Sequence, residues 1–201
     1  GEYFRKELPV NNTAGPVWTN ITVTATGQAT VSGNTAVAPA LQQFVHDEDG
    51  NLTQDGLWEY TWDAENRLMS VQSRDTVPEG GRKRLEFAYD WQGRRIEKAV
   101  FVWNPSTLDY ELSTRTKFAY DGWNLIAVLD DNNTPLLSFA WGSDLSGSLQ
   151  GAGGVGGLIS VTVHSGANTG TYFYCFDGNG NVLGLIDAAN GDLVARYEYG
   201  P

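Results

Sequence analysis

The nine residues Tyr60-Thr61-Trp62-Asp63-Ala64-Glu65-Asn66-Arg67-Leu68 contain the pattern on which the fold of this chain depends. Alternation with a period of two places Tyr60 and Trp62 on one face of a strand, so we expect that face to be buried. The side chain of Asp63 can accept hydrogen bonds from its own turn, and Asn66 belongs to the residue types that adopt a left-handed backbone. The stretch therefore predicts a strand, a tight turn and a second strand.

The same pattern recurs along the chain as an aromatic residue, any residue, an aromatic residue or His, and then Asp. Clear copies begin at Phe44, Phe87, Phe118 and Tyr174. In every clear copy the third residue after the Asp is Gly or Asn, which favours a type I turn closed by a left-handed residue. The predicted turn-forming residues are Asp47, Gly50, Asp63, Asn66, Asp90, Gly93, Asp121, Asn124, Asp177 and Gly180.

Further turn signals lie between these hairpins, so that turns recur about every ten residues. This spacing is typical of a long antiparallel meander. We predict an all-β fold in which the hairpins form a curved or spiralling sheet, part of a β-shell. Residues 44–201 are the predicted sheet region. Residues 1–43 carry almost no charge after Glu7 and are predicted to form a small β insertion or leading strands.

Composition supports a folded chain and excludes several classes of partner. The 201 residues are 41% hydrophobic and 12% aromatic, which argues against disorder. The single cysteine, Cys175, excludes a disulfide framework within one copy. A net charge of −11 disfavours nucleic acid and anionic membranes as partners. No apolar run approaches the roughly 20 residues of a membrane span. We therefore expect no nucleic-acid partner and no membrane span.

Three motifs that could carry chemistry have simpler structural explanations. The glycines from Gly151 to Gly156 satisfy G-x-G-x-x-G, but a β-branched strand and not a helix follows them, which excludes a dinucleotide site. His164 and Ser165 are adjacent on a strand and point to opposite faces. Cys175 has no nearby His or basic cluster that would lower its pKa. The sequence thus predicts no catalytic residue, no cofactor and no enzyme.

Two further features concern metal and partner binding. The oxygen-rich stretches 47–51 and 130–133 lack the distal bidentate Glu of a calcium loop, and turn chemistry explains both without a metal. Trp91 and Trp123 fall within predicted tight turns, where burial is least expected. We therefore predict that these two tryptophans contact a ligand or a partner.

The recurring Tyr/Phe-x-Tyr/Trp-Asp-x-x-Gly/Asn pattern resembles the YD repeats of the RHS class. The tract from Asp144 to Leu158 and the ending Tyr197-Glu198-Tyr199-Gly200-Pro201 resemble parts of the RHS repeat-associated core region. The resemblance covers about residues 41–201. It implies a bacterial protein that is extracellular or on the cell surface. It also implies a hollow β-shell, as in toxin-complex cocoons and teneurin shells.

On this basis we expect a non-catalytic structural scaffold, a shell segment used for encapsulation or surface interaction. The expected partners are the rest of a larger RHS protein or other copies of the chain, together with a protein cargo or a glycan. Two alternatives remain. One is a self-assembling filament or sheath subunit that completes its open strand edges with a second copy. The other is a carbohydrate-binding or adhesion module that uses the exposed tryptophans.

Overall fold

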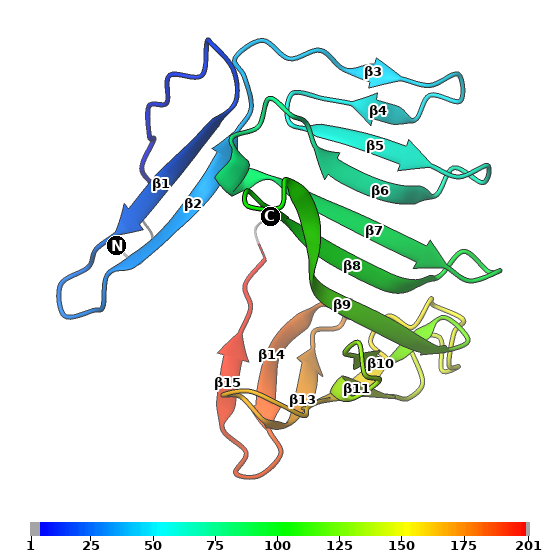
Figure 1. The fold of residues 1–201 in the computed structure, drawn as a ribbon. Helices are drawn as coiled ribbons and strands as arrows, with labels where there is room; N and C mark the ends of the chain where they lie inside the picture. Colours follow the sequence, from blue (N-terminus) through cyan, green and yellow to red (C-terminus); the bar gives the residue numbers. More distant parts are fainter. Residues whose placement is uncertain (1–4, 200–201) are drawn as a thin grey trace. The chain divides into compact units, whose positions relative to one another are not determined.

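The computed structural model describes residues 5–199, and its regular structure is almost entirely β-strand (Figure 1). Strands account for 49% of the chain. The predicted all-β class and antiparallel meander are confirmed. The elements are β1 (Val17–Val23), β2 (Val31–Val37), β3 (Val45–His46), β4 (Leu52–Gln54), β5 (Trp58–Trp62), β6 (Leu68–Ser73), the 3-10 helix η1 (Glu79–Gly81), β7 (Lys83–Tyr89), β8 (Arg95–Asn104), β9 (Asp109–Asp121), β10 (Asn124–Leu129), β11 (Pro135–Trp141), β12 (Leu158–Val163), β13 (Gly170–Phe176), β14 (Val182–Asp187) and β15 (Leu193–Arg196).

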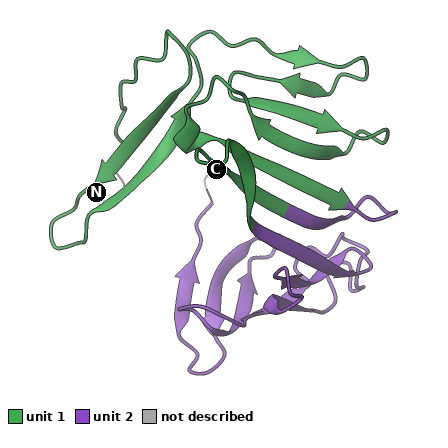
Figure 2. Ribbon diagram, viewed as in Figure 1, with its two compact units in different colours: residues 1–88, 99–113 green, residues 89–98, 114–201 purple. Residues whose placement is uncertain are grey.

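Thirteen strands, β3 to β15, form one antiparallel sheet in which every strand lies beside its neighbours in sequence, and the sheet is not closed. Short turns favour this order, because an antiparallel pair needs only a few connecting residues. Strands β1 and β2 form a separate two-stranded sheet. The chain divides into two compact units, unit 1 (residues 1–88 and 99–113) and unit 2 (residues 89–98 and 114–201) (Figure 2). The sequence-based division at residue 43 stays a prediction.

The β1–β2 hairpin is anchored within unit 1 by Trp18. Its indole ring lies directly on the backbone of η1, where a Cβ atom added to Gly81 would come within 2.8 Å of the ring. Nearby in sequence, Val77 is only 2% exposed and Ser73 only 1% exposed. The Ser73 hydroxyl accepts a hydrogen bond from the backbone N–H of Lys83 at 2.9 Å. Glycine is required at position 81 because the ring occupies the space of a side chain.

The repeated hairpins share a β-bulge close to their turns. The register shifts between Val45 and His46, between Thr61 and Trp62, and between Cys175 and Phe176. A type I turn followed by a left-handed residue and a bulge is a common hairpin connection. Where the bulged aromatic is Trp62, its indole N–H donates to the carbonyl of Leu52 at 2.8 Å. The aromatic residue of one hairpin is thereby tied to the hairpin before it.

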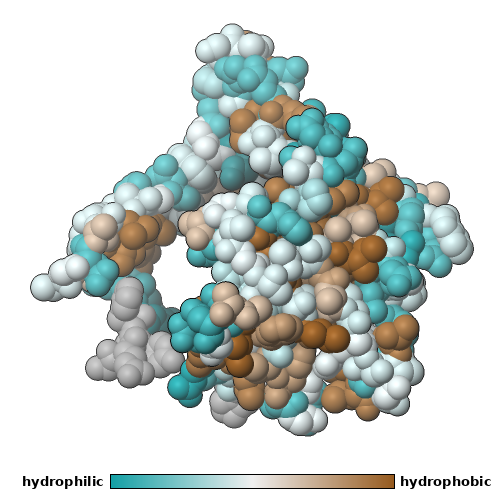
Figure 3. All heavy atoms as spheres, turned by 90° about the horizontal axis from the view of Figure 1, so that it is seen from below, coloured by the Kyte–Doolittle hydropathy of each residue, from teal (hydrophilic) through white to brown (hydrophobic). Residues whose placement is uncertain are grey.

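Burial in the described part of the chain is shallow. Val77, Ala99 and Val161 are its most buried hydrophobic side chains, with exposed fractions of 2%, 2% and 7%. Most repeat aromatics are half-buried on the sheet. Figure 3 shows hydrophobic residues as several patches separated by hydrophilic surface. Within residues 5–199, no helix is long and apolar enough to cross a membrane.

Candidate functional site

The turn at Asp63 shows how the repeated motif folds. One carboxylate oxygen of Asp63 accepts hydrogen bonds from the backbone N–H groups of Glu65 (2.9 Å) and Arg67 (3.0 Å). The other oxygen accepts from Nε of Arg67 at 2.8 Å. Asn66 has a φ of 58°, in the left-handed region. The backbone N–H of Arg67 is the main cause that holds the pKa of Asp63 below its usual value.

Three other turns repeat this arrangement around Asp47, Asp90 and Asp177. Each aspartate accepts backbone hydrogen bonds from the second and fourth residues after it. The side chain of the fourth residue donates a further bond to the carboxylate, from Asn51 (3.1 Å), Arg94 (2.7 Å) and Asn181 (2.9 Å). The closing glycines Gly50, Gly93 and Gly180 have φ values of 87°, 80° and 82°. The motif thus encodes a closed network of hydrogen bonds within the turn of each hairpin.

The turn between β9 and β10 differs from this scheme. Asp121 and Asn124 pair directly across the two strands, and the left-handed residue is Gly122, with a φ of 57°. The expectation that Asn124 adopts the left-handed conformation is therefore wrong. The physical reason is that Gly122 adopts the left-handed conformation without steric cost, so the turn closes with two residues between the strands.

One further turn of the same kind was not recognised from the sequence, where 130–133 was interpreted as a return turn. Asp130 accepts from the N–H groups of Asn132 (2.9 Å) and Thr134 (2.8 Å), and Asn133 has a φ of 63°. The sequence did contain the signal for this turn, because Asn133 is the third residue after Asp130. The ammonium group of Lys117 contacts the side-chain oxygen of Asn133 at 2.9 Å. A built-in cation therefore occupies the edge of this oxygen cluster.

Trp91 and Trp123 project from two turns of unit 2. Trp91 is 87% exposed and Trp123 is 63% exposed. The two turns are linked, because the guanidinium of Arg94 donates a hydrogen bond to the carbonyl of Gly122. The structure therefore brings both tryptophan-bearing turns together at one end of unit 2. Their predicted contact with a ligand or partner stays a prediction.

The glycine-rich tract between β11 and β12 folds around Asp144, which sequence reasoning did not single out. Asp144 is 6% exposed, and its carboxylate accepts from the Ser146 hydroxyl (2.5 Å) and from the N–H groups of Ser146 (2.9 Å), Ala152 (2.7 Å) and Gly154 (3.1 Å). The hydrogen bond from the Ser146 hydroxyl is the main cause that lowers the pKa of Asp144 to about 2. The carboxylate is fully engaged in holding the loop, and strand β12 follows as the sequence predicted.

One of the described histidines is hydrogen-bonded to a serine hydroxyl. Nε2 of His164, the residue that follows β12, lies 2.9 Å from the hydroxyl of Ser138 on β11, and the pair is exposed. The sequence could not indicate this pairing, because it depends on the register of β11 against β12. Cys175 is a half-buried free thiol. Within residues 5–199, no group of three or more His, Cys, Asp or Glu side chains is arranged to hold a metal ion.

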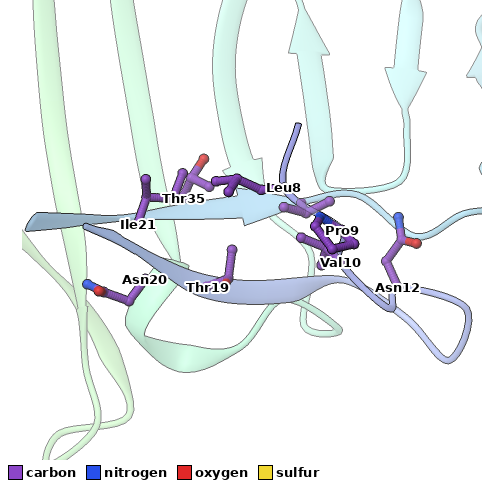
Figure 4. Close-up of a pocket in the computed structure, with 9 residues that line it drawn as sticks. Leu8, Pro9, Val10, Asn12, Thr19, Asn20, Ile21 and Thr35 are labelled. Carbon is purple, nitrogen blue, oxygen red and sulfur yellow. The ribbon is translucent and has the colours of Figure 1, made fainter. Parts of the chain in front are cut away.

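A hollow of about 520 Å³ lies against the β1–β2 hairpin (Figure 4). Leu8, Pro9 and Val10 line it from the segment before β1, and Ile21 and Thr35 line it from the two strands. The remaining lining residues are Asn12, Thr19, Asn20 and Val37. None of these side chains titrates near neutral pH, so the hollow offers no acid–base chemistry.

Comparison with known proteins found relatives that are named as enzymes. No protein-family model matches the chain. It is 30% identical over 160 residues to "tRNA3(Ser)-specific nuclease WapA" of Bacillus spizizenii, to "tRNA(Glu)-specific nuclease WapA" of Bacillus subtilis subsp. natto, and to "tRNA nuclease WapA" of Bacillus subtilis. Each match spans 79% of this chain but only 6% of the relative. A protein of unknown function from Bacteroides fragilis matches at 16% identity and a TM-score of 0.25, covering 78% of this chain and 90% of that one. A likeness at that level supports no conclusion.

These relatives correct the expectations about family and function. They are named as tRNA nucleases, a different kind of protein from the RHS/YD-repeat scaffold that the motifs suggested, so that family assignment is wrong. The expectations of a non-enzyme and of a structural scaffold, with its filament and carbohydrate-binding alternatives, are corrected on the same finding. The physical reason is that an Asp-centred turn reports local backbone geometry. It says nothing of the chemistry of a much longer protein.

Proposed function

We propose that this chain is a segment of a larger protein that cleaves tRNA. The observation that carries the proposal is the 30% identity over 160 residues to three proteins named as tRNA nucleases. The chain spans 6% of their length, so the proposal concerns the activity of the parent protein.

The charge pattern supports placing the main tRNA contact in another part of that protein. The electrostatic attraction of a protein to RNA phosphates comes chiefly from Lys and Arg side chains. The chain carries a net charge of −11, and residues 121–201 contain eight acids and the single base Arg196. Two cations elsewhere in unit 2 are engaged within the sheet. Arg94 pairs with Asp90 at 2.7 Å, and Arg115 lies 3.2 Å from Glu97.

The decisive experiment measures tRNA cleavage by the purified parent protein. Total tRNA is incubated with the parent and resolved on a denaturing gel. Discrete cleavage products are expected, and a parent that leaves all tRNA intact under conditions where it is folded would overturn the proposal.

A parallel assay with the 201-residue chain alone locates the activity. If that chain produces the same fragments, the reacting groups lie within it, and His164 with Ser138 is the first pair to substitute because its imidazole could act as a general acid or base. A His164→Gln variant of the parent, with His46→Gln as the control, then measures the contribution of that pair.

A further inference from the structure

Five large hydrophobic side chains are exposed on adjoining loops of unit 2. Trp91 is 87% exposed, Trp123 63%, Leu145 57%, Leu149 59% and Val155 46%. We call this set the apolar rim. Single exposed hydrophobic residues are ordinary on protein surfaces, but a cluster of them marks an interaction site.

Hydrogen bonds connect the turns and the loop that carry the apolar rim. The guanidinium of Arg94, in the turn of Trp91, donates to the carbonyl of Gly122, in the turn of Trp123. The side chain of Gln150 in the β11–β12 loop donates to Asn124 at 2.5 Å, next to Trp123. The two turns and the loop that carry the five hydrophobic side chains are therefore held side by side.

The β11–β12 loop is uncharged and bonds many of its backbone N–H groups internally. None of its residues from 145 to 158 carries a charge. Ten backbone N–H groups between 145 and 157 donate hydrogen bonds inside the loop, to backbone carbonyls, to serine hydroxyls or to the Asp144 carboxylate. A polar group that leaves water without a partner destabilises the structure, so these internal bonds lower the cost of bringing the loop to the polar headgroup region of a bilayer. The loop can approach that region with ten of its N–H groups already bonded.

We propose that the apolar rim binds the surface of a lipid bilayer with neutral headgroups. Tryptophan favours the membrane–water interface, since its ring is apolar and its indole N–H is polar, and Leu and Val supply side chains for the acyl boundary. The rim consists of projecting turns and loops, which suits insertion into a fluid surface. A net charge of −11 opposes anionic headgroups, so the attraction is apolar.

The turns of unit 1 support this assignment by contrast. The equivalent tip positions there carry Glu48 and Asp49 in one turn and Ala64 and Glu65 in the next. Such tips are strongly hydrated and would be repelled from a bilayer. The same kind of turn therefore carries a charged tip after Asp47 and Asp63 and an exposed indole after Asp90. This inference goes beyond tRNA cleavage and does not depend on it.

Vesicle flotation of the 201-residue chain tests the proposal. Vesicles of phosphatidylcholine alone, and of phosphatidylcholine mixed with phosphatidylglycerol, are incubated with the protein and floated through a sucrose gradient. The double variant Trp91→Ser/Trp123→Ser removes the two largest side chains of the rim. Leu41→Ser removes a hydrophobic side chain of unit 1 that is 93% exposed, and serves as the matched control.

The wild type and Leu41→Ser are expected to float with phosphatidylcholine and to bind less as phosphatidylglycerol is added. The double variant is expected to bind roughly tenfold more weakly or worse, because two large apolar side chains no longer leave water. Brominated lipids should quench tryptophan fluorescence in the wild type, and less in the double variant.

Three results would overturn the proposal. They are no flotation of the wild type, equal flotation of the double variant, and flotation only with phosphatidylglycerol. A fourth result, self-association in size-exclusion chromatography that the double variant loses without any vesicle binding, would identify the rim as a protein contact instead. Circular dichroism checks that each variant is folded.

Discussion

Hairpin turns in the two units share a base and differ at the tip. In unit 1 the Asp63 turn closes on Asn66 and exposes Ala64 and Glu65. In unit 2 the Asp90 turn has the same carboxylate hydrogen bonds and exposes Trp91. The base fixes the backbone through local hydrogen bonds, so the two residues at the tip are free to vary. Folding information and surface chemistry are therefore carried by different residues of one motif.

The sharpest way to test that separation is to add a methyl group at the base of a turn in each unit. Gly180 in unit 2 has a φ of 82°, and a Cβ atom there would lie 2.5 Å from Val155. Gly50 in unit 1 has a φ of 87° and open space around it. We expect Gly180→Ala to lower the free energy of unfolding by about 3 kcal/mol, from the left-handed backbone and the clash together. Gly50→Ala should cost about 1–2 kcal/mol, from the backbone alone.

Urea unfolding of both variants measures the difference. Equal losses would show that Val155 moves aside without cost and that the loop of unit 2 is not packed against its neighbouring turn.

The second prediction concerns the side chains that connect turns within each unit. Asn124 is 9% exposed and accepts a hydrogen bond from Gln150 at 2.5 Å, whereas Asn51 is partly exposed and donates to Asn66 at 2.7 Å. Asn124→Ala should cost about 1–2 kcal/mol, because the Gln150 amide loses its partner in a region with little water. Asn51→Ala should cost less than about 1 kcal/mol, since water replaces the bond. Faster amide hydrogen exchange of the β11–β12 loop is expected in the first variant and not in the second.

The third prediction concerns the stability of the unit 2 loop in acid, which depends on the carboxylate of Asp144. The pKa of Asp144 falls from 3.8 to about 2, because the Ser146 hydroxyl and backbone N–H groups bond its ionised form. A carboxyl whose folded pKa is lowered stabilises the fold above its unfolded pKa, and that contribution is lost as the pH falls through the folded value. The loop should therefore loosen between about pH 4 and pH 2.

The carboxyl carbon shift of Asp144, followed by NMR, gives its pKa directly. The variant Asp144→Asn should already have a loose loop at pH 6 and lose this acid transition. A midpoint for Asp144 near 4 would contradict the hydrogen-bond network around it.

Sequence reasoning identified the parts of the fold that local backbone chemistry determines. Asp63 and Asn66 specify a turn because every hydrogen bond involved joins residues at most four positions apart. The role of Asp144 could not be read in the same way, since its donors Ala152 and Gly154 lie eight and ten residues away in a glycine-rich tract. The pairing of His164 with Ser138 depends on strand register. The sequence could not predict an activity for a further reason. The relatives named as tRNA nucleases extend far beyond the matched segment.

The smallest expected effect is the one that completes the contrast between base and tip. Trp91 is 87% exposed, and only its backbone forms part of the turn. Trp91→Ser should therefore change the free energy of unfolding by less than about 0.5 kcal/mol. Glu48→Ser in unit 1 should have an equally small effect, since that tip is exposed too. Urea unfolding of the two variants, compared with Gly93→Ala, tests the idea. A loss from Trp91→Ser as large as that from Gly93→Ala would mean that the tryptophan stabilises the fold, and the tip would then not be free for an interaction.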